Sequence, residues 1–178
     1  TTNDEATKSF YVYSSGGGVA APFTEDFESG GFSSDWDVQN LNSNASWDIS
    51  SSVGGYGNSG YCVFMDNAAS NNRDIDELIM ADYDLSSLSA PAFSFDVAYS
   101  KYRKNYDSLS VLYSLDCGNT WSQIWKDGGQ TLSTSTAGDS VKPFVPDVTE
   151  WKTVKIPLWS LKSQPKVKFK FKSVSAGG

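Results

Sequence analysis

Carboxylates are the side chains in this sequence whose type and spacing could do chemistry. The 178 residues include 21 Asp and Glu but no His, which removes the usual base of a serine or cysteine triad and every His-containing zinc or iron site. A glycosidase-type carboxylate pair or a site for a hard cation remains open. Glu25, Asp26 and Glu28 are the densest acidic group, and in a strand Asp26 and Glu28 would share one face and repel unless a cation or a base lay between them.

A second acidic group contains Asp74, Asp76 and Glu77. A glycosidase needs two carboxyl groups that face each other across a cleft. Because side chains alternate along a strand, Asp74 and Asp76 would lie side by side on one face, which is adjacency and not opposition. We therefore predict that the chain has no catalytic residues and is not an enzyme.

Residues 114–121 (Ser-Leu-Asp-Cys-Gly-Asn-Thr-Trp) fit the Asp-box pattern S-x-D-x-G-x-T-W. Asp116 and Asn119 can bond neighbouring backbone N–H groups, Gly118 can adopt a positive φ, and Trp121 can fold over the turn. Sialidase-type propellers carry several copies of this pattern on separate blades, and this chain has one. The pattern therefore predicts a structural hairpin and not a glycosidase.

A loop rich in aromatic and basic residues is the candidate ligand-binding site. Aromatic faces with polar neighbours can hold sugars by stacking and hydrogen bonding. Trp151 and Trp159 are further candidates, and the alternative is that these rings fill the core. The predicted ligand-binding residues are Tyr99, Tyr102, Arg103, Tyr106 and Trp125.

Composition limits the partners. A net charge of −7 with a pI of about 4.5 argues against nucleic acid or an anionic membrane surface as partner. No apolar run approaches the roughly 18 residues that cross a bilayer, so we predict no membrane insertion. Cys62 and Cys117 could form one disulfide in an oxidising compartment, or they could be two buried thiols.

The pattern of short apolar runs predicts an all-β fold. Ser, Gly, Asn and Thr separate these runs, and residues 93–99 and 166–172 alternate clearly between apolar and polar side chains. In the second of these runs the lysines would form a solvated face, which would also discourage edge-to-edge pairing if this strand lies at a sheet margin. About ten strands predict a two-sheet antiparallel β-sandwich, either a jelly roll or an immunoglobulin-like sandwich. Further strands are expected at 61–65, 77–83, 108–115, 121–126 and 151–157, and weaker ones at 23–27, 35–38 and 46–50, whereas 127–149 reads as a surface connection.

The two ends of the chain suggest a piece of a larger protein. Residues 1–18 contain a strand-like run at 7–13 followed by a Gly/Ser linker. A lone strand is not stable by itself, so this run either joins the main sheet or belongs to a preceding domain. No signal peptide precedes Thr1, so we expect a mature or excised segment. Residues 19–178 form the predicted sandwich, and the turn-like Ser-Ala-Gly-Gly end leaves open whether a final strand is missing.

Several segments, taken in order, carry a resemblance to a known family. The matching stretches are 23–28 with Trp36, 74–78, 91–99, 107–114 leading into the Asp-box, 151–154 and 168–171. Over about residues 23–173 they resemble the MAM-like jelly-roll domains called choice-of-anchor J, which occur in secreted bacterial proteins, beside pappalysin-type metalloproteases or in adhesins exported by the type IX system. The family's usual last strand, of the type N-N-[LIF]-x-[LI]-D-[DN]-I, is absent, and residues 1–13 resemble the last strand of a PKD-type domain.

The resemblance implies a structural calcium ion near the first strand, held by Glu28 or Glu25. The expected partners are Asp66, Asn67 and Asp74, in or near a loop rich in oxygen ligands. It also implies a non-catalytic accessory or adhesion module of a secreted or cell-surface bacterial metalloprotease or adhesin. Its partners would be neighbouring domains and a glycan or a host cell-surface protein. The alternatives are a carbohydrate-binding module and a purely structural spacer.

Overall fold

The computed structural model describes residues 18–42, 44–102, 104–138 and 144–177. The predicted strand at 7–13 and most of the linker after it lie outside these ranges. Within them the chain forms ten strands and three one-turn helices, η1 (Tyr56–Asn58), α1 (Gly129–Leu132) and η2 (Trp159–Leu161). The strands are β1 (Val19–Ala20), β2 (Asp37–Asn40), β3 (Asp48–Ser50), β4 (Cys62–Phe64), β5 (Asn72–Asp84), β6 (Ala92–Val97), β7 (Ser108–Ser114), β8 (Ser122–Gly128), β9 (Lys152–Pro157) and β10 (Val167–Ala176).

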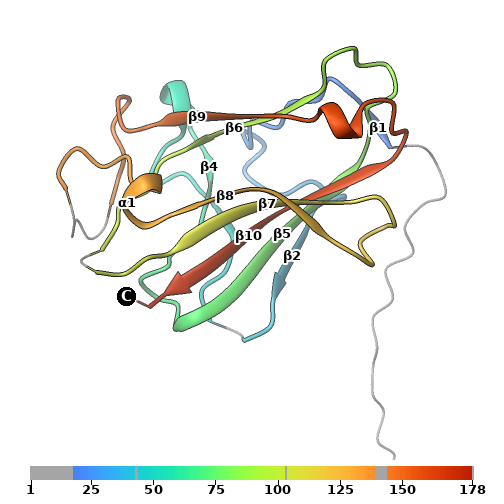
Figure 1. Ribbon diagram of the computed structural model, residues 1–178. Helices are drawn as coiled ribbons and strands as arrows, with labels where there is room; N and C mark the ends of the chain where they lie inside the picture. Colours follow the sequence, from blue (N-terminus) through green and yellow to red (C-terminus); the bar gives the residue numbers. More distant parts are fainter. Residues whose placement is uncertain (1–17, 43, 103, 139–143, 178) are drawn as a thin grey trace, which may run out of the picture.

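The strands form two layers. One six-stranded sheet has the order β1-β5-β10-β7-β8, and β2 pairs with β5 beside this path. All its pairings are antiparallel except that of β1 with β5. The antiparallel pair β6–β9 crosses above the large sheet, and β3–β4 forms a second small pair (Figure 1). The predicted all-β, two-sheet sandwich is confirmed.

Aromatic rings from the two layers meet in the core. Phe93 and Phe95 on β6 lie with their ring centroids 5.0 Å from those of Phe169 and Phe171 on β10, respectively. Leu78 and Val111 of the large sheet are completely buried. Each buried side chain of this size contributes about 1.5–3 kcal/mol relative to exposure. The alternation predicted for β6 and for the apolar side of β10 is confirmed.

The lysines of β10 differ from the prediction. The strand lies between β5 and β7 and not at a margin, and Lys168 and Lys170 are 3% and 6% exposed. Lys168 Nζ lies 3.1 Å from Asp82 Oδ1 and donates to the Met80 carbonyl, while Lys170 Nζ donates to Glu77 Oε2 at 2.7 Å. Each buried charge therefore has an acidic partner, which burial requires.

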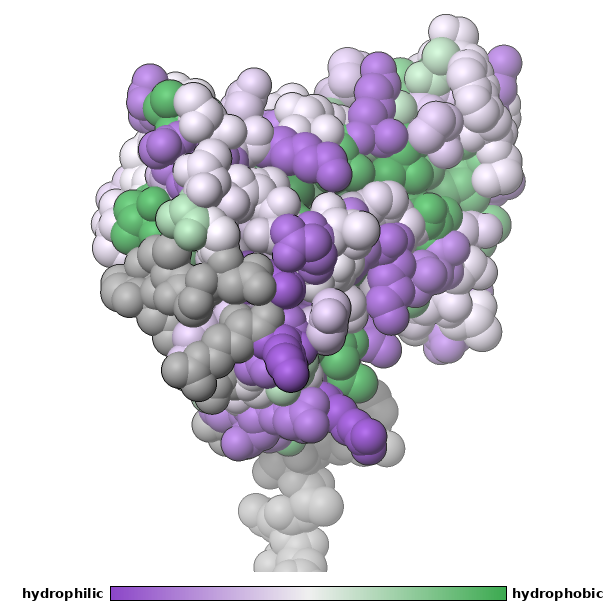
Figure 2. Space-filling view, turned by 60° about the vertical axis from the view of Figure 1, so that its left-hand side comes forward, coloured by the Kyte–Doolittle hydropathy of each residue, from purple (hydrophilic) through white to green (hydrophobic). Residues whose placement is uncertain are grey.

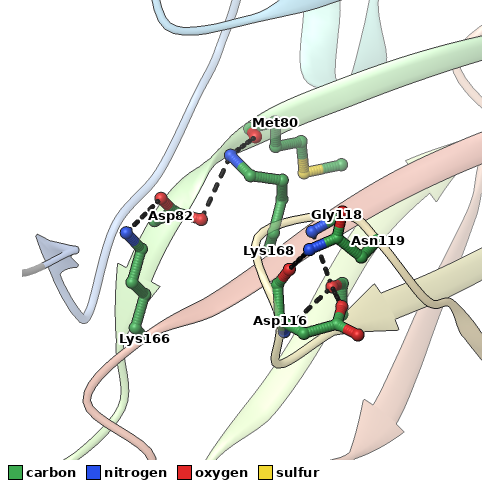
Figure 3. A network of polar contacts seen from close by, with 8 residues as sticks. Met80, Asp82, Asp116, Gly118, Asn119, Lys166 and Lys168 are labelled. Atoms are coloured by element: carbon green, nitrogen blue, oxygen red, sulfur yellow. Dashed lines mark hydrogen bonds and ion pairs between the residues drawn. The ribbon is translucent and has the colours of Figure 1, made fainter. Parts of the chain in front are cut away.

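The Asp-box turn between β7 and β8 covers these lysines. Asp116 Oδ1 accepts hydrogen bonds from the Ser114 hydroxyl and the Thr120 N–H, and the Trp121 ring lies 4.2 Å from Lys170 Nζ. Gly118 has a φ of +91°, and a Cβ there would be 3.4 Å from the Trp121 ring. Figure 3 shows this turn beside the contacts of Asp82 with Lys166 and Lys168. The hairpin predicted at this motif is confirmed.

The predicted strand at 23–27 is wrong: that segment is irregular and leads into a turn at 28–29. Phe27 has a φ of +61°, its N–H donates to Glu25 Oε1, and its ring packs against Trp36 with centroids 5.4 Å apart. A carboxylate that bonds the backbone two residues on competes with strand pairing. The connection after β8 is also less exposed than expected, because Leu132 of α1 is buried.

No helix in the described ranges is long and apolar enough to span a bilayer.

Candidate functional site

A groove of about 470 Å³ lies beside η1, at the end of the sandwich where β9 begins. Two loop segments far apart in the sequence form its walls. One precedes and includes η1, and the other leads into β9. The lining residues are Val53, Gly54, Gly55, Asn58, Ser59, Pro146, Asp147, Val148 and Trp151.

The Glu28 carboxylate holds the η1 wall in place. Its oxygens accept hydrogen bonds from the Ser59 hydroxyl, from the Gly60 N–H at 3.3 Å and from the Tyr61 N–H at 3.0 Å. The Ser59 hydroxyl and the Tyr61 N–H lower the pKa of Glu28, because they stabilise its charged form. Gly55 allows the tight approach, since a Cβ there would be 2.5 Å from the Tyr61 carbonyl oxygen.

The opposite wall depends on the buried carboxylate of Glu150. It accepts hydrogen bonds from the backbone N–H and the hydroxyl of Thr136, at 2.6 and 2.8 Å, and from the Asp147 N–H at 3.1 Å. The Thr136 contacts, followed by the Asp147 N–H, lower the pKa of Glu150. Asp147 in turn accepts both the N–H and the hydroxyl of Thr149 at 2.6 Å. The loop before β9 is therefore fixed by carboxylates at two points.

The groove combines apolar and polar groups. Trp151 is a half-buried lining residue, and Val148 and the neighbouring Tyr56 are 61% and 52% exposed. Asn58 and Ser59 supply polar groups to the same concave surface. Figure 2, which brings this end of the molecule forward, shows apolar areas among hydrophilic ones. Concave sites with apolar walls and a few polar groups are the usual form of ligand-binding sites.

The predicted aromatic site at 99–106 is arranged differently. Tyr99 donates its hydroxyl to Asp107 Oδ2 at 2.8 Å, and Trp125 packs in the core with its ring centroid 5.2 Å from that of Phe95. Tyr102 is half-buried and Tyr106 is 66% exposed. Arg103 lies outside the described residues. Among the described aromatic residues predicted to bind a ligand, Tyr106 is therefore the one with a strongly exposed ring.

The five predicted calcium ligands lie in separate environments. Glu25 caps the turn at Phe27, and Glu28 bonds the η1 wall. Asp66 caps the Ala68 N–H, Asn67 accepts the Ser173 hydroxyl at 3.2 Å, and Asp74 accepts the Asn71 N–H at 2.6 Å. The last three are at the end of the sandwich formed by the start of β5 and the end of β10. In the described part of the chain, no three His, Cys, Asp or Glu side chains form a metal-ligand cluster.

The two cysteines are free thiols in this structure. Cys62 is buried on β4, where burial raises its pKa, whereas Cys117 is exposed in the Asp-box turn with a φ of +60°. The alternatives were a disulfide between these cysteines and two buried thiols. The structure has two separate thiols, of which one is buried and one is exposed.

Sequence reasoning missed most of the groove. Trp151 was a candidate, but segments 53–59 and 146–148 read as ordinary connections. The available signal was the occurrence of apolar residues such as Tyr56 and Val148 inside polar, Gly-rich or Pro-containing loops, where core packing does not require them.

Some solved protein structures have the same β-sandwich architecture as this chain. No family model matches this chain, and no curated protein sequence matches it. The K1 cleaved adhesin domain of Lys-gingipain from Porphyromonas gingivalis W83 is similar in structure, with a TM-score of 0.56 and 16% identity over 85% of this chain and 92% of that one. The K2 cleaved adhesin domain of Lys-gingipain has a TM-score of 0.54 and 16% identity, over 86% and 95% of the two chains.

A carbohydrate-binding module, CBM27-1 of Caldicellulosiruptor saccharolyticus, solved with mannohexaose, is also similar. It has a TM-score of 0.51 and 15% identity, over 85% of both chains. At these identities the likeness establishes the β-sandwich fold and not a function.

Proposed function

We propose that this chain is a non-catalytic binding module of a larger secreted or cell-surface protein, and that it holds its ligand in the groove between η1 and the loop before β9. The observation that carries this proposal is the groove itself. Two carboxylates that are not among the lining residues, Glu28 and Glu150, fix its walls. A site whose walls are already ordered loses less entropy on binding.

An adhesin-type role in such a protein is part of the proposal. The sandwich is shared with two adhesin domains of Lys-gingipain, and the sequence resembles domains of secreted bacterial metalloproteases and adhesins. Neighbouring domains of the parent protein and a molecule of another cell surface are the proposed partners. Calcium stabilisation stays a prediction for this module.

The arrangement of acidic groups supports a non-catalytic role. Among the described residues that line the groove, Asp147 is the one carboxylate, and its Oδ1 already accepts two hydrogen bonds from Thr149. Glycoside hydrolysis requires two carboxyl groups about 5–10 Å apart on either side of the scissile bond. The groove is therefore built to bind and not to cleave.

A saccharide is the ligand class that the groove composition favours. Trp151 is an aromatic lining residue of the kind that can stack on a sugar, and Asn58 and Asp147 are polar lining residues that can hydrogen-bond to one. We therefore propose carbohydrate binding as the specific form of this function, in place of the loop at 99–106.

A glycan array tests the proposal with three proteins: the wild type, Trp151→Ala and Trp159→Ala. Trp159 is 64% exposed on η2 and does not line the groove, so it controls for loss of any surface tryptophan. Mannohexaose is a suitable soluble probe for calorimetry of any hit. We expect binding by the wild type and by Trp159→Ala, and loss of binding by Trp151→Ala, because stacking contributes about 1–3 kcal/mol per ring by analogy with nucleobase stacking.

Absence of glycan binding by the wild type would contradict the saccharide assignment and favour a protein ligand or the spacer role. Equal binding by wild type and Trp151→Ala would move the site away from the groove.

A further inference from the structure

The groove beside η1 has negative charge at both of its walls. Among the described residues that line it, Asp147 is the charged one. On the opposite wall the Ser59 hydroxyl donates to the Glu28 carboxylate, and on the wall of Asp147 the Glu150 carboxylate accepts the Asp147 N–H at 3.1 Å. A ligand in the groove would therefore lie between walls that each carry or contact a carboxylate.

These three carboxylates are ionised at neutral pH. Hydrogen bonds lower the pKa of Glu28 and the pKa of Glu150, as described for the two walls. The hydroxyl and the N–H of Thr149 lower the pKa of Asp147 in the same way. A carboxyl group with an ordinary pKa of about 4 that is lowered further is fully charged at pH 7. The field in the groove therefore favours cations and disfavours anions.

Asp147 presents its charge from a fixed position. Its Oδ1 accepts the N–H and the hydroxyl of Thr149, both at 2.6 Å, which ties the side chain to the loop before β9. The residue is exposed and lines the groove, so it is accessible to a ligand there. A side chain that is ordered before binding loses little conformational entropy when the ligand arrives.

Trp151 complements this carboxylate. It lines the same groove and is half-buried. An indole ring attracts an ammonium group placed over its face, and it can also stack on the apolar side of a sugar ring. Hydrogen bonds between an ammonium group and a carboxylate are stronger than those between neutral groups. The two residues are therefore suited to a sugar that carries an ammonium group.

We propose that Asp147 sets the charge selectivity of the groove, which prefers saccharides with a free amino group, accepts neutral ones and rejects those with a carboxylate or a sulfate. This inference rests on the proposed saccharide-binding function and names the class of sugar. An ammonium group would receive its counter-charge from Asp147. An acidic group would lie beside a like charge, and no cation among the described lining residues would compensate it.

An NMR titration followed at the Trp151 indole N–H tests the inference with three short sugars. A glucosamine trisaccharide carries ammonium groups, its N-acetylated form has the same rings without the charge, and a galacturonic acid trisaccharide carries carboxylates. We expect affinity to fall in that order. The net charge of −7 attracts cationic sugars to the whole surface. Binding in the groove is therefore counted only where the Trp151 signal responds and the Trp159 signal stays constant.

Asp147→Asn removes the charge and keeps an oxygen that can accept from Thr149. The readout is the ratio of the affinities for the amino and the N-acetylated sugar, because a general loosening of the wall would lower both affinities together. We expect a ratio of about two to five in the wild type, as for an exposed ion pair, and a ratio close to one in Asp147→Asn. Added salt should lower the wild-type ratio, since ions screen exposed charges.

Asp84→Asn is the matched control. Asp84 Oδ1 accepts the N–H of Ser86, two residues on, as Asp147 does with Thr149, and Ser86 likewise lowers the pKa of Asp84. Asp84 does not line the groove, so its variant should keep the wild-type ratio.

The outcomes separate this inference from the function on which it rests. Equal affinities for the amino and N-acetylated sugars, an unchanged ratio in Asp147→Asn, or tighter binding of the galacturonic acid sugar would overturn the inference and leave saccharide binding in place. So would a Trp151 signal that responds to a neutral glycan from the array but to neither glucosamine sugar. A Trp151 signal that responds to no saccharide would overturn both. A stronger response to acetyl-lysine amide than to the glucosamine sugar would overturn the saccharide class in favour of a protein ligand.

Discussion

The buried Glu150 carboxylate accepts both the backbone N–H and the hydroxyl of Thr136, with one oxygen, Oε1, at 2.6 and 2.8 Å. Its other oxygen, Oε2, accepts the Asp147 N–H. One side chain just before β9 therefore connects two parts of the long segment after α1 and sets the position of a groove wall.

The first prediction follows from this connection. Both carboxylate oxygens of Glu150 accept hydrogen bonds. In Glu150→Gln an amide NH2 group replaces one of these oxygens and faces an N–H donor, so at least one hydrogen bond is lost. The groove wall should therefore become more mobile while the fold is kept. Hydrogen exchange at the Thr136 and Asp147 N–H groups should speed up, and ligand affinity at the groove should fall. The exposed acid Asp35, changed to Asn, is the control and should alter neither. Unchanged exchange in Glu150→Gln would show that Glu150 does not hold the wall.

The second prediction concerns acid stability. Hydrogen bonds from the Thr120 hydroxyl, the Ser114 hydroxyl and the Thr120 N–H lower the pKa of Asp116 to about 2, below its value of about 3.9 in an unfolded chain. The folded state therefore binds fewer protons, so the stabilisation by Asp116 is present above pH ~3.9 and lost as pH falls towards ~2. Urea unfolding across this range should show a shallower pH dependence for Asp116→Asn than for the wild type, and identical slopes would contradict this role.

The third prediction concerns the buried ion pair. In Asp82→Ala, Lys168 would keep a buried charge without its acidic partner, which typically costs about 3–5 kcal/mol. The double variant Asp82→Leu with Lys168→Met should recover most of this loss, because apolar residues of similar size often replace such pairs without cost. Denaturant unfolding measures both. A single variant as stable as the wild type would show that Lys168 does not need Asp82.

The fourth prediction concerns the core. Leu161 of η2 is 1% exposed and belongs to the hydrophobic cluster between the layers, so Leu161→Ala should cost about 2–5 kcal/mol. Leu115, which is 50% exposed in the Asp-box turn, is the matched control, and Leu115→Ala should change stability by less than about 0.5 kcal/mol. Equal effects of the two changes on the unfolding midpoint would contradict the assigned core.

The layers of the sandwich could be predicted because alternation and turn chemistry are local signals. Phe93 and Phe95 on β6 show their buried face in the sequence itself, and the Asp-box carries its own hydrogen-bond partners. The position of β10 could not be predicted in this way. Alternating lysines normally mark a solvated face, but here Asp82, Glu77 and the Trp121 ring cover that face from distant parts of the chain.

The candidate sites depend on contacts that local patterns do not contain. Glu28 lies in an acidic stretch that suggests a cation ligand. In the fold, however, its carboxylate accepts hydrogen bonds from the backbone N–H groups of Gly60 and Tyr61, which are distant in the sequence. From the sequence Asp76 is a candidate only for a catalytic acid, because its burial and its contact with Ser46 arise when the loop before β3 folds over β5. The residue types are local information, whereas the role of each carboxylate depends on tertiary packing.

The most direct test of the central claim is the set of indole N–H signals of the six tryptophans in a nitrogen-15 NMR spectrum, recorded as the ligand found on the array is added. We predict that the Trp151 signal, assigned with Trp151→Phe, shifts or broadens while the Trp159 signal stays unchanged. Movement of the Trp159 signal with a constant Trp151 signal would contradict a ligand site in the groove.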